Sequence, residues 1–169
     1  MPTTPTRRPS LPPFERVVAT HGPLLLRFCA AQVGRERAED CFQETLLAAL
    51  RGYPQLHDAD AIRAWLLRIA ARKAVDLHRA RARTPVPVED ADARADTAAP
   101  GHDDAVVRDA ALWQQVRALP RKQREAVTLR YLADLSHGEI GEVMQTSEQA
   151  ARRNVFEALR RLREDDGTR

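Results

Sequence analysis

Four neighbouring positions near the end of the chain carry side chains suited to reading base edges: Glu148, Gln149, Arg152 and Arg153. Arginine matches two acceptors of guanine, and glutamine matches the donor and acceptor of adenine. Their spacing puts all four on the first turns of one helix. Whether the two arginines read bases or hold phosphates stays open, because the sequence does not place a side chain within a groove.

Two capping signals predict the helices that would hold these side chains. Ser136 and Glu139 form a capping box, and a second cap, of the T-x-x-Q kind, begins at Thr146. The apolar stripe expected on the second helix consists of Ala151, Val155, Ala158, Leu159 and Leu162. Two capped helices separated by about three residues form a helix-turn-helix, which places its second helix in the major groove. We expect DNA contacts from Ser136, His137, Ser147, Glu148, Gln149, Arg152 and Arg153.

A second concentration of cations lies on a helix predicted at about residues 61–81. Its basic side chains, with those just after it, are Arg63, Arg68, Arg72, Lys73, Arg79, Arg81 and Arg83. Asp76 is the only carboxylate among them. Like charges repel unless an anion neutralises them, so we interpret this helix as a nucleic-acid contact, with a solvated face as the alternative. Trp65 falls in the apolar stripe and is expected in the core, which leaves Tyr53 as the nearby candidate for stacking on bases.

A third polar surface, of opposite sign, is predicted on the helix at about residues 35–51. Its exposed face carries Glu39, Asp40, Gln43 and Glu44. Its buried stripe is expected to be Ala38, Cys41, Phe42, Thr45, Leu46, Ala49 and Leu50. A helix from Pro13 to about Val33 precedes it, and Pro23 is expected to interrupt that helix.

A further helix is predicted to open with Pro120 at its first position. It is expected to carry Val127, Tyr131 and Leu132 inward.

These elements predict an all-α protein with two small helical domains. Glycine is scarce, with 7 residues, and long alternating Val/Ile/Thr runs are absent. Residues 84–104 hold three prolines and six carboxylates against Arg94 alone, which predicts a flexible acidic linker. We expect a disordered tail at 1–12, a first domain at 13–83, a second at 105–164 and a tail at 165–169.

Several function classes are excluded or disfavoured by composition. The two cysteines, Cys29 and Cys41, have no metal-ligand spacing and are interpreted as buried hydrophobes kept reduced. The five histidines show neither metal nor triad spacing, and no phosphate-binding glycine loop occurs. We therefore expect no enzyme, no metal and no cofactor. No signal peptide or membrane span is recognisable, which predicts a cytoplasmic protein without membrane insertion.

The motifs, taken in order, resemble those of bacterial extracytoplasmic-function RNA polymerase sigma factors in their minimal two-domain form. AEDCFQETLLAAL at 38–50 and AWLLRIAARKAVD at 64–76 are similar to sigma region two. LPRKQREAVTLRYL at 119–132, LSHGEIGEVM at 135–144 and the helix after them are similar to region four. The resemblance covers about residues 14–83 and 107–164 and rests on the order of the motifs across both domains.

The resemblance implies a subunit that binds core RNA polymerase and directs promoter recognition and opening. Glu39, Asp40, Gln43 and Glu44 would dock on the clamp helices of the largest polymerase subunit. Region two would contact the minus-ten element through Tyr53, His57, Arg63, Arg68, Arg72, Lys73 and Arg79. The recognition helix would contact the minus-thirty-five element, and an anti-sigma protein becomes a candidate partner. The alternative is a stand-alone helix-turn-helix regulator, which would need neither the acidic face nor the basic helix.

Three positions depart from the family pattern. Ala71-Arg72 stands where relatives usually have Arg-Asn, and an aromatic often found before Trp65 is absent. We therefore expect minus-ten recognition to follow a different sequence, or melting to be weak. Gln145-Thr146 occupies a turn where the family often has a glycine.

Overall fold

The computed structural model describes residues 11–83 and 104–166, and in these ranges the chain forms helices and no strands. This confirms the all-α expectation. The elements are α1 (Phe14–Val33), α2 (Arg35–Gly52), the 3-10 turn η1 (Tyr53–Gln55), α3 (Ile62–Arg83), α4 (Asp104–Ala118), α5 (Arg121–Tyr131), α6 (His137–Met144) and α7 (Glu148–Asp166). The predicted linker and N-terminal tail lie largely outside the described residues.

The N-terminal half, α1 to α3, is a three-helix bundle. Gly34 ends α1 and begins α2 with a φ of 83°, a conformation that suits a residue without a side chain. The bundle is filled by Phe28, Leu25, Leu66 and Leu67, each buried almost completely. Small residues let the helices approach closely, and Cys29 and Cys41 are buried among them.

The C-terminal half, α4 to α7, is built around the helix-turn-helix. The apolar stripe of α7 is confirmed, with Ala151, Val155 and Ala158 buried and Leu159 and Leu162 partly buried. A small cluster of Val116, Leu119, Val127 and Ala158 joins α4 to α5 and α7. The carbonyl of Leu135 accepts a hydrogen bond of 2.9 Å from Arg130 and so fixes the turn between α5 and α6.

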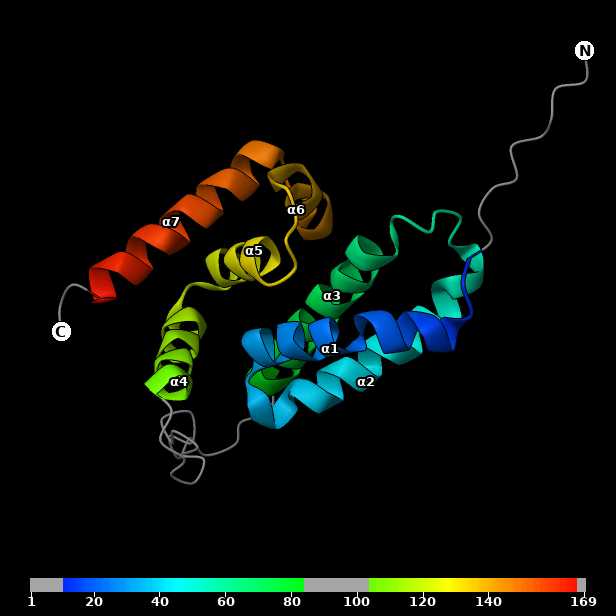
Figure 1. Ribbon diagram of the computed structural model, residues 1–169, viewed down its shortest axis with the longest axis horizontal. Helices are drawn as coiled ribbons and strands as arrows, with labels where there is room; N and C mark the ends of the chain where they lie inside the picture. Colours follow the sequence, from blue (N-terminus) through cyan, green and yellow to red (C-terminus); the bar gives the residue numbers. More distant parts are fainter. Residues whose placement is uncertain (1–10, 84–103, 167–169) are drawn as a thin grey trace, which may run out of the picture.

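The two halves pack against each other in this structure. α6 lies against α3, and the C-terminal half also packs on α1 through α5 and α4 (Figure 1). One continuous cluster of buried side chains runs from Leu66 and Leu67 in the N-terminal half to Leu129 and Ile140 in the other. The chain therefore adopts a closed arrangement, in which each half covers part of the surface of the other.

Four local expectations are wrong. α1 continues through Pro23 without a break, because packed side chains on both sides of the proline hold the helix together. Leu50, expected in the core, is 53% exposed, while Tyr131, expected to point inward on α5, is 65% exposed. Both lie in the last turns of their helices, beyond the elements that would cover them. Pro120 caps α5 and does not form its first turn.

Candidate nucleic-acid interface

The first helix of the helix-turn-helix is fixed by the predicted capping box. The backbone N–H of Glu139 donates to the Ser136 hydroxyl at 3.3 Å, and the Glu139 carboxylate accepts from the Ser136 backbone N–H at 2.8 Å. The side-chain and backbone hydrogen bonds from Ser136 lower the pKa of Glu139 from its ordinary value. The carboxylate also lies at the positive end of α6, where it is electrostatically favoured.

The cap of the second helix differs from the expectation by one residue. Ser147, and not Thr146, supplies the oxygen: the N–H of Ala150 donates to the Ser147 hydroxyl at 3.1 Å. α7 then begins at Glu148. The sequence offers two hydroxyl residues in succession, and the length of the turn decides which of them becomes the cap.

The turn itself accommodates the missing glycine in an unexpected way. Gln145 takes the left-handed conformation, with φ 53° and ψ 50°, which glycine adopts most readily. Close approach is achieved instead at Gly141 inside α6, where an added Cβ would lie 2.9 Å from the carbonyl oxygen of Thr146 and 3.2 Å from Glu148 N. Such distances leave no room for a side chain, so Gly141 sets the distance between α6 and the start of α7.

The residues predicted to read DNA are exposed or partly exposed on the helix-turn-helix. Ser147, Glu148, Gln149, Arg152 and Arg153 are all exposed on or just before the first turns of α7. Arg152 is held by an ion pair of 3.2 Å to Glu148, one helical turn earlier. Before α6, Ser136 is exposed, and His137 is partly exposed.

The cations of α3 do not form one surface. Arg68, Arg72 and Arg79 are exposed on the side that faces the C-terminal half and line a groove there. Lys73 points to the opposite side and pairs with Glu44 of α2 at 3.3 Å. Arg63 is partly exposed, and its charge contributes to lowering the pKa of both His21 and Glu139.

The loop residues predicted to meet the minus-ten element, Tyr53 and His57, lie just before the N-terminal end of α3. His57 is exposed, whereas Tyr53 is packed between two aromatic rings. The Tyr53 ring centroid lies 5.2 Å from Phe14 and 6.3 Å from Trp65, and its hydroxyl donates to the carbonyl of Pro12 at 2.5 Å. Tyr53 must leave this cluster before a base can stack on it.

The acidic face of α2 is present and is larger than expected. Glu39, Asp40, Gln43 and Glu44 are all exposed. Leu47 and Leu50, also exposed, continue the same face toward the end of the helix. Helical spacing places Leu47 and Leu50 on the same face as Gln43. The sequence prediction missed this because it assigned Leu50 to the buried stripe of α2.

Polar groups near the contact between the halves are incompletely paired. His78 of α3 donates its ring N–H to the carbonyl of Gln32 of α1 at 3.0 Å, a hydrogen bond within the N-terminal half. Burial lowers the pKa of His78, and the charges of Arg124, Arg37 and Arg121 lower it further. The side-chain nitrogen of Gln32 and Nε of Arg124 are buried without a hydrogen-bond partner. Polar contacts of this kind are typical of an interface that opens.

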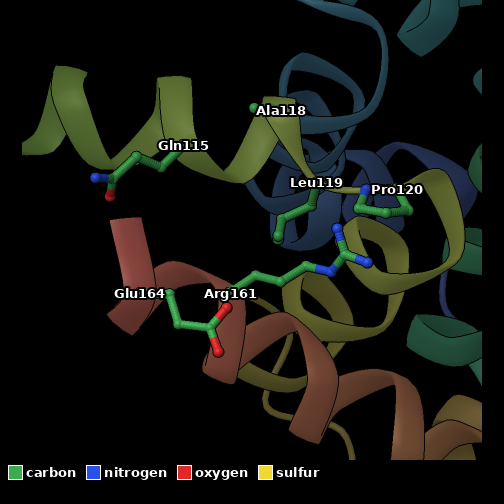
Figure 2. A pocket seen from close by; sticks show the side chains of 6 residues that line it. All are labelled: Gln115, Ala118, Leu119, Pro120, Arg161 and Glu164. Atoms are coloured by element: carbon green, nitrogen blue, oxygen red, sulfur yellow. The ribbon is translucent and has the colours of Figure 1, made fainter. Parts of the chain in front are cut away.

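Other sites offer little chemistry. A pocket of about 180 Å³ lies between the end of α4 and the last turns of α7. Figure 2 shows Arg161 extending across it toward Leu119 and Pro120. Ligand pockets usually exceed about 300 Å³, so this one is small.

The buried Cys41 side chain, hydrogen-bonded to Cys29, holds the pKa of the Cys29 thiol far above its ordinary value.

Two absences also hold for the described part of the chain. There, no group of His, Cys, Asp and Glu side chains could hold a metal ion. None of the helices in residues 11–83 and 104–166 is long and apolar enough to cross a bilayer.

Both halves match known families in sequence. Residues 17–84 match the family described as Sigma-70 region 2, and residues 109–162 match Sigma-70, region 4. The chain is 32% identical over 154 residues to the ECF RNA polymerase sigma factor ShbA of Streptomyces griseus, covering 83% of this chain and 81% of that one. It is 33% identical over 161 residues to the ECF RNA polymerase sigma factor SigD of Mycobacterium tuberculosis, covering 90% and 76%.

Solved structures show the same fold. The sigma factor RpoE of Bartonella quintana, crystallised with the anti-sigma factor NepR, matches with a TM-score of 0.73 at 23% identity, covering 89% of this chain and 94% of that one. CnrH, solved with the cytosolic domain of CnrY, matches with a TM-score of 0.68 at 23% identity, covering 92% and 88%.

Proposed function

Because the chain belongs to the extracytoplasmic-function family of RNA polymerase sigma factors, we propose that its two halves divide the promoter between them. As a sigma factor, the chain binds core RNA polymerase and directs promoter recognition and opening. The observation that carries the function is the match of both halves, in order, at 17–84 and 109–162. A stand-alone regulator is not favoured, since it would not need the region 2 match at residues 17–84.

The C-terminal half would hold the minus-thirty-five element. The rigid placement of α7 by Ser147 and Gly141 supports this assignment, because recognition needs a helix held at one depth in the major groove. The exposed side chains of Gln149, Arg152 and Arg153 would face base edges and phosphates. Ser136, His137, Ser147 and Glu148 lie beside them and would contact the backbone or the flanking bases.

The N-terminal half would capture the minus-ten element. Arg68, Arg72 and Arg79 form a row along α3 that could follow a phosphate backbone. Arg63 and Lys73 would join them from either side, and His57 and Tyr53 would meet the strand at the loop. Trp65 is partly buried beside Tyr53, in agreement with a structural role.

The exposed face of α2 would bind the clamp helices of the largest polymerase subunit. Glu39, Asp40, Gln43 and Glu44 supply charge and hydrogen-bonding groups, and Leu47 supplies exposed apolar area beside them. Apolar side chains surrounded by polar ones are typical of protein interfaces. α2 lies away from α6, so this face remains available in the closed chain.

The closed arrangement must open for both promoter contacts to form together. Arg72 and Arg153 line one groove here, whereas two promoter elements would need them apart. We therefore propose domains at 13–83 and 105–164, joined by an acidic linker at 84–104 that allows this separation. An anti-sigma protein that favours the closed chain is a further proposed partner, since the similar sigma factor RpoE was crystallised with the anti-sigma factor NepR.

Run-off transcription with core polymerase on a panel of promoters tests the function. We expect specific transcripts that depend on the chain, and co-elution of the chain with core polymerase. Asp40→Asn should weaken co-elution, while Arg153→Ala should leave co-elution intact and reduce transcription. A chain that fails to bind core polymerase would rule the proposal out.

A further inference from the structure

The groove between the two halves is a second candidate site, with a volume of about 780 Å³. Its walls come from α3, α5 and the α6–α7 turn, so it exists only while the halves are together. Six cationic side chains line it: Arg68, Arg72, Arg79, Arg121, Lys122 and Arg153. Two of them, Arg121 and Lys122, belong to none of the surfaces assigned above.

The carboxylates in this groove are too few to balance its cations. Asp76 is exposed among the arginines of α3, and Glu125 is buried behind Arg121, with 3.8 Å between their charged atoms. Burial raises the pKa of Glu125. Closing the chain therefore brings like charges together, and such a cost is offset when an anion enters the space between them.

The remaining lining is suited to a base and not to phosphate alone. Val75, Val143 and Met144 provide an apolar patch from α3 and α6. Gln145 and Asn154 bring amide side chains to the same groove, and amides match the donor and acceptor pattern of a base edge. The volume lies within the range of about 300–1,000 Å³ typical of ligand pockets.

We infer that this groove binds a small nucleotide ligand carrying two or more phosphates, and that the bound ligand holds the chain closed. The arginines of α3 would take the phosphates from one wall, while Arg121 and Lys122 would take them from the other. Free nucleoside polyphosphates and short single-stranded fragments share this chemistry. Because the ligand would cover Arg72 and Arg153, it would compete with promoter DNA.

Calorimetric titration of the full chain at low salt tests the inference, with GTP, a 5′-phosphorylated dinucleotide and inorganic tripolyphosphate as probes. We expect saturable one-to-one binding of GTP or the dinucleotide that weakens as salt rises. The tighter of the two identifies the source of the ligand. If tripolyphosphate binds as tightly as either, the nucleotide assignment is overturned.

Matched variants separate the groove from general charge. Arg121→Ser with Lys122→Ser should lower the affinity at least tenfold, and Lys122→Glu alone should lower it severalfold. Arg35→Ser with Arg51→Ser removes the same charge from exposed positions of α2 and should change the affinity less than twofold. Equal losses in both double variants, with unchanged circular dichroism, would overturn the site.

Small-angle X-ray scattering of the full chain measures closure. Saturating ligand should make the radius of gyration equal to or smaller than that of the free chain, and expansion would contradict the inference. None of these measurements uses polymerase. Their failure therefore leaves the sigma-factor function untouched, and failure of run-off transcription leaves the nucleotide site untouched.

Discussion

The two basic surfaces of the chain are positioned in different ways. α7 is oriented by contacts within a short stretch, residues 136–151, where two serine caps and the close approach at Gly141 fix its start. α3 is oriented by packing against α1 and α2, with contacts such as Cys41 to Ala70 and Gln32 to His78 that join residues 29 and 46 positions apart. The start of α7 is thus specified locally, whereas the basic surface of α3 depends on the whole bundle.

The two surfaces are therefore sensitive to different substitutions. A change in the bundle core should disturb α3, and through the shared core it should also disturb the C-terminal half. A change in the caps should loosen α7 and leave α3 in place.

Leu66→Ala should have the largest effect, because Leu66 is fully buried between α3 and its neighbours. Truncating a buried leucine leaves a cavity and costs about 2–5 kcal/mol. Urea denaturation should show this loss for the whole chain in one transition, because the core is continuous. Leu47→Ala, at an exposed position of α2, should change the unfolding free energy by less than about 0.5 kcal/mol.

Gly141→Ala should destabilise the helix-turn-helix by about 1–3 kcal/mol, the usual cost of overpacking. The new Cβ would meet the Thr146 carbonyl and force α6 away from the turn. Gly138→Ala is the matched control in the same helix, since its nearest neighbour lies 3.9 Å away, and it should be neutral or slightly stabilising. Equal effects from both changes in thermal unfolding would contradict the proposed spacing role.

Ser136→Ala should cost about 1 kcal/mol, because it removes the cap of α6. Ser136→Thr retains the hydroxyl and should restore most of the loss. Amide hydrogen exchange should show faster exchange in α6 and the following turn, while α3 remains protected. Equally faster exchange in α6 and α3 would show that the helix-turn-helix is not specified locally.

Glu44→Gln should change the unfolding free energy by no more than about 1 kcal/mol, since Glu44 and Lys73 form an ion pair with both side chains partly exposed. Its effect on polymerase binding should be larger, because Glu44 belongs to the proposed docking face. Parallel urea denaturation and co-elution measurements separate the two. A large loss of stability would mean that the pair orients α3 after all.

Acid should affect the two regions at different pH values. The pKa of His78 is lowered from 6.5 by burial, so its contribution to the packing of α3 on α1 is full above that pH and is lost as the pH falls through the lower folded value. The pKa of Glu139 is lowered from 4.5, so the α6 cap keeps its contribution to a still lower pH. Hydrogen exchange at decreasing pH should therefore report loosening of α3 before loosening of α6, and His78→Gln should remove the first step.

Much of the helical framework could be predicted from the sequence. The limits of α1, the capping box at Ser136 and the buried stripe of α7 follow from residue type and helical spacing, which act over a few residues. The exposed polar positions at the start of α7 followed from the same spacing. These features are local, and local signals are strong.

What the sequence did not reveal depends on contacts between distant segments. The exposure of Leu50 and Tyr131 depends on where neighbouring helices end, which periodicity does not contain. The packing of Tyr53 against Phe14 joins residues far apart in the chain. The closed arrangement likewise requires Leu129 and Ile140 to share a core with Leu66. The amphipathic pattern of each half does not reveal whether the two halves pack together.

The shared core also has a consequence for synthesis on the ribosome. The face of α3 near Ala71 is covered by α6, which lies roughly 70 residues later in the chain. At about 5–20 residues per second, that face emerges roughly 4–14 seconds before its cover is made. During this interval the nascent chain already carries the exposed acidic face of α2 and an apolar surface of α3 that α6 has not yet covered. The N-terminal bundle is thus the segment of the growing chain that chaperones or core polymerase can meet first.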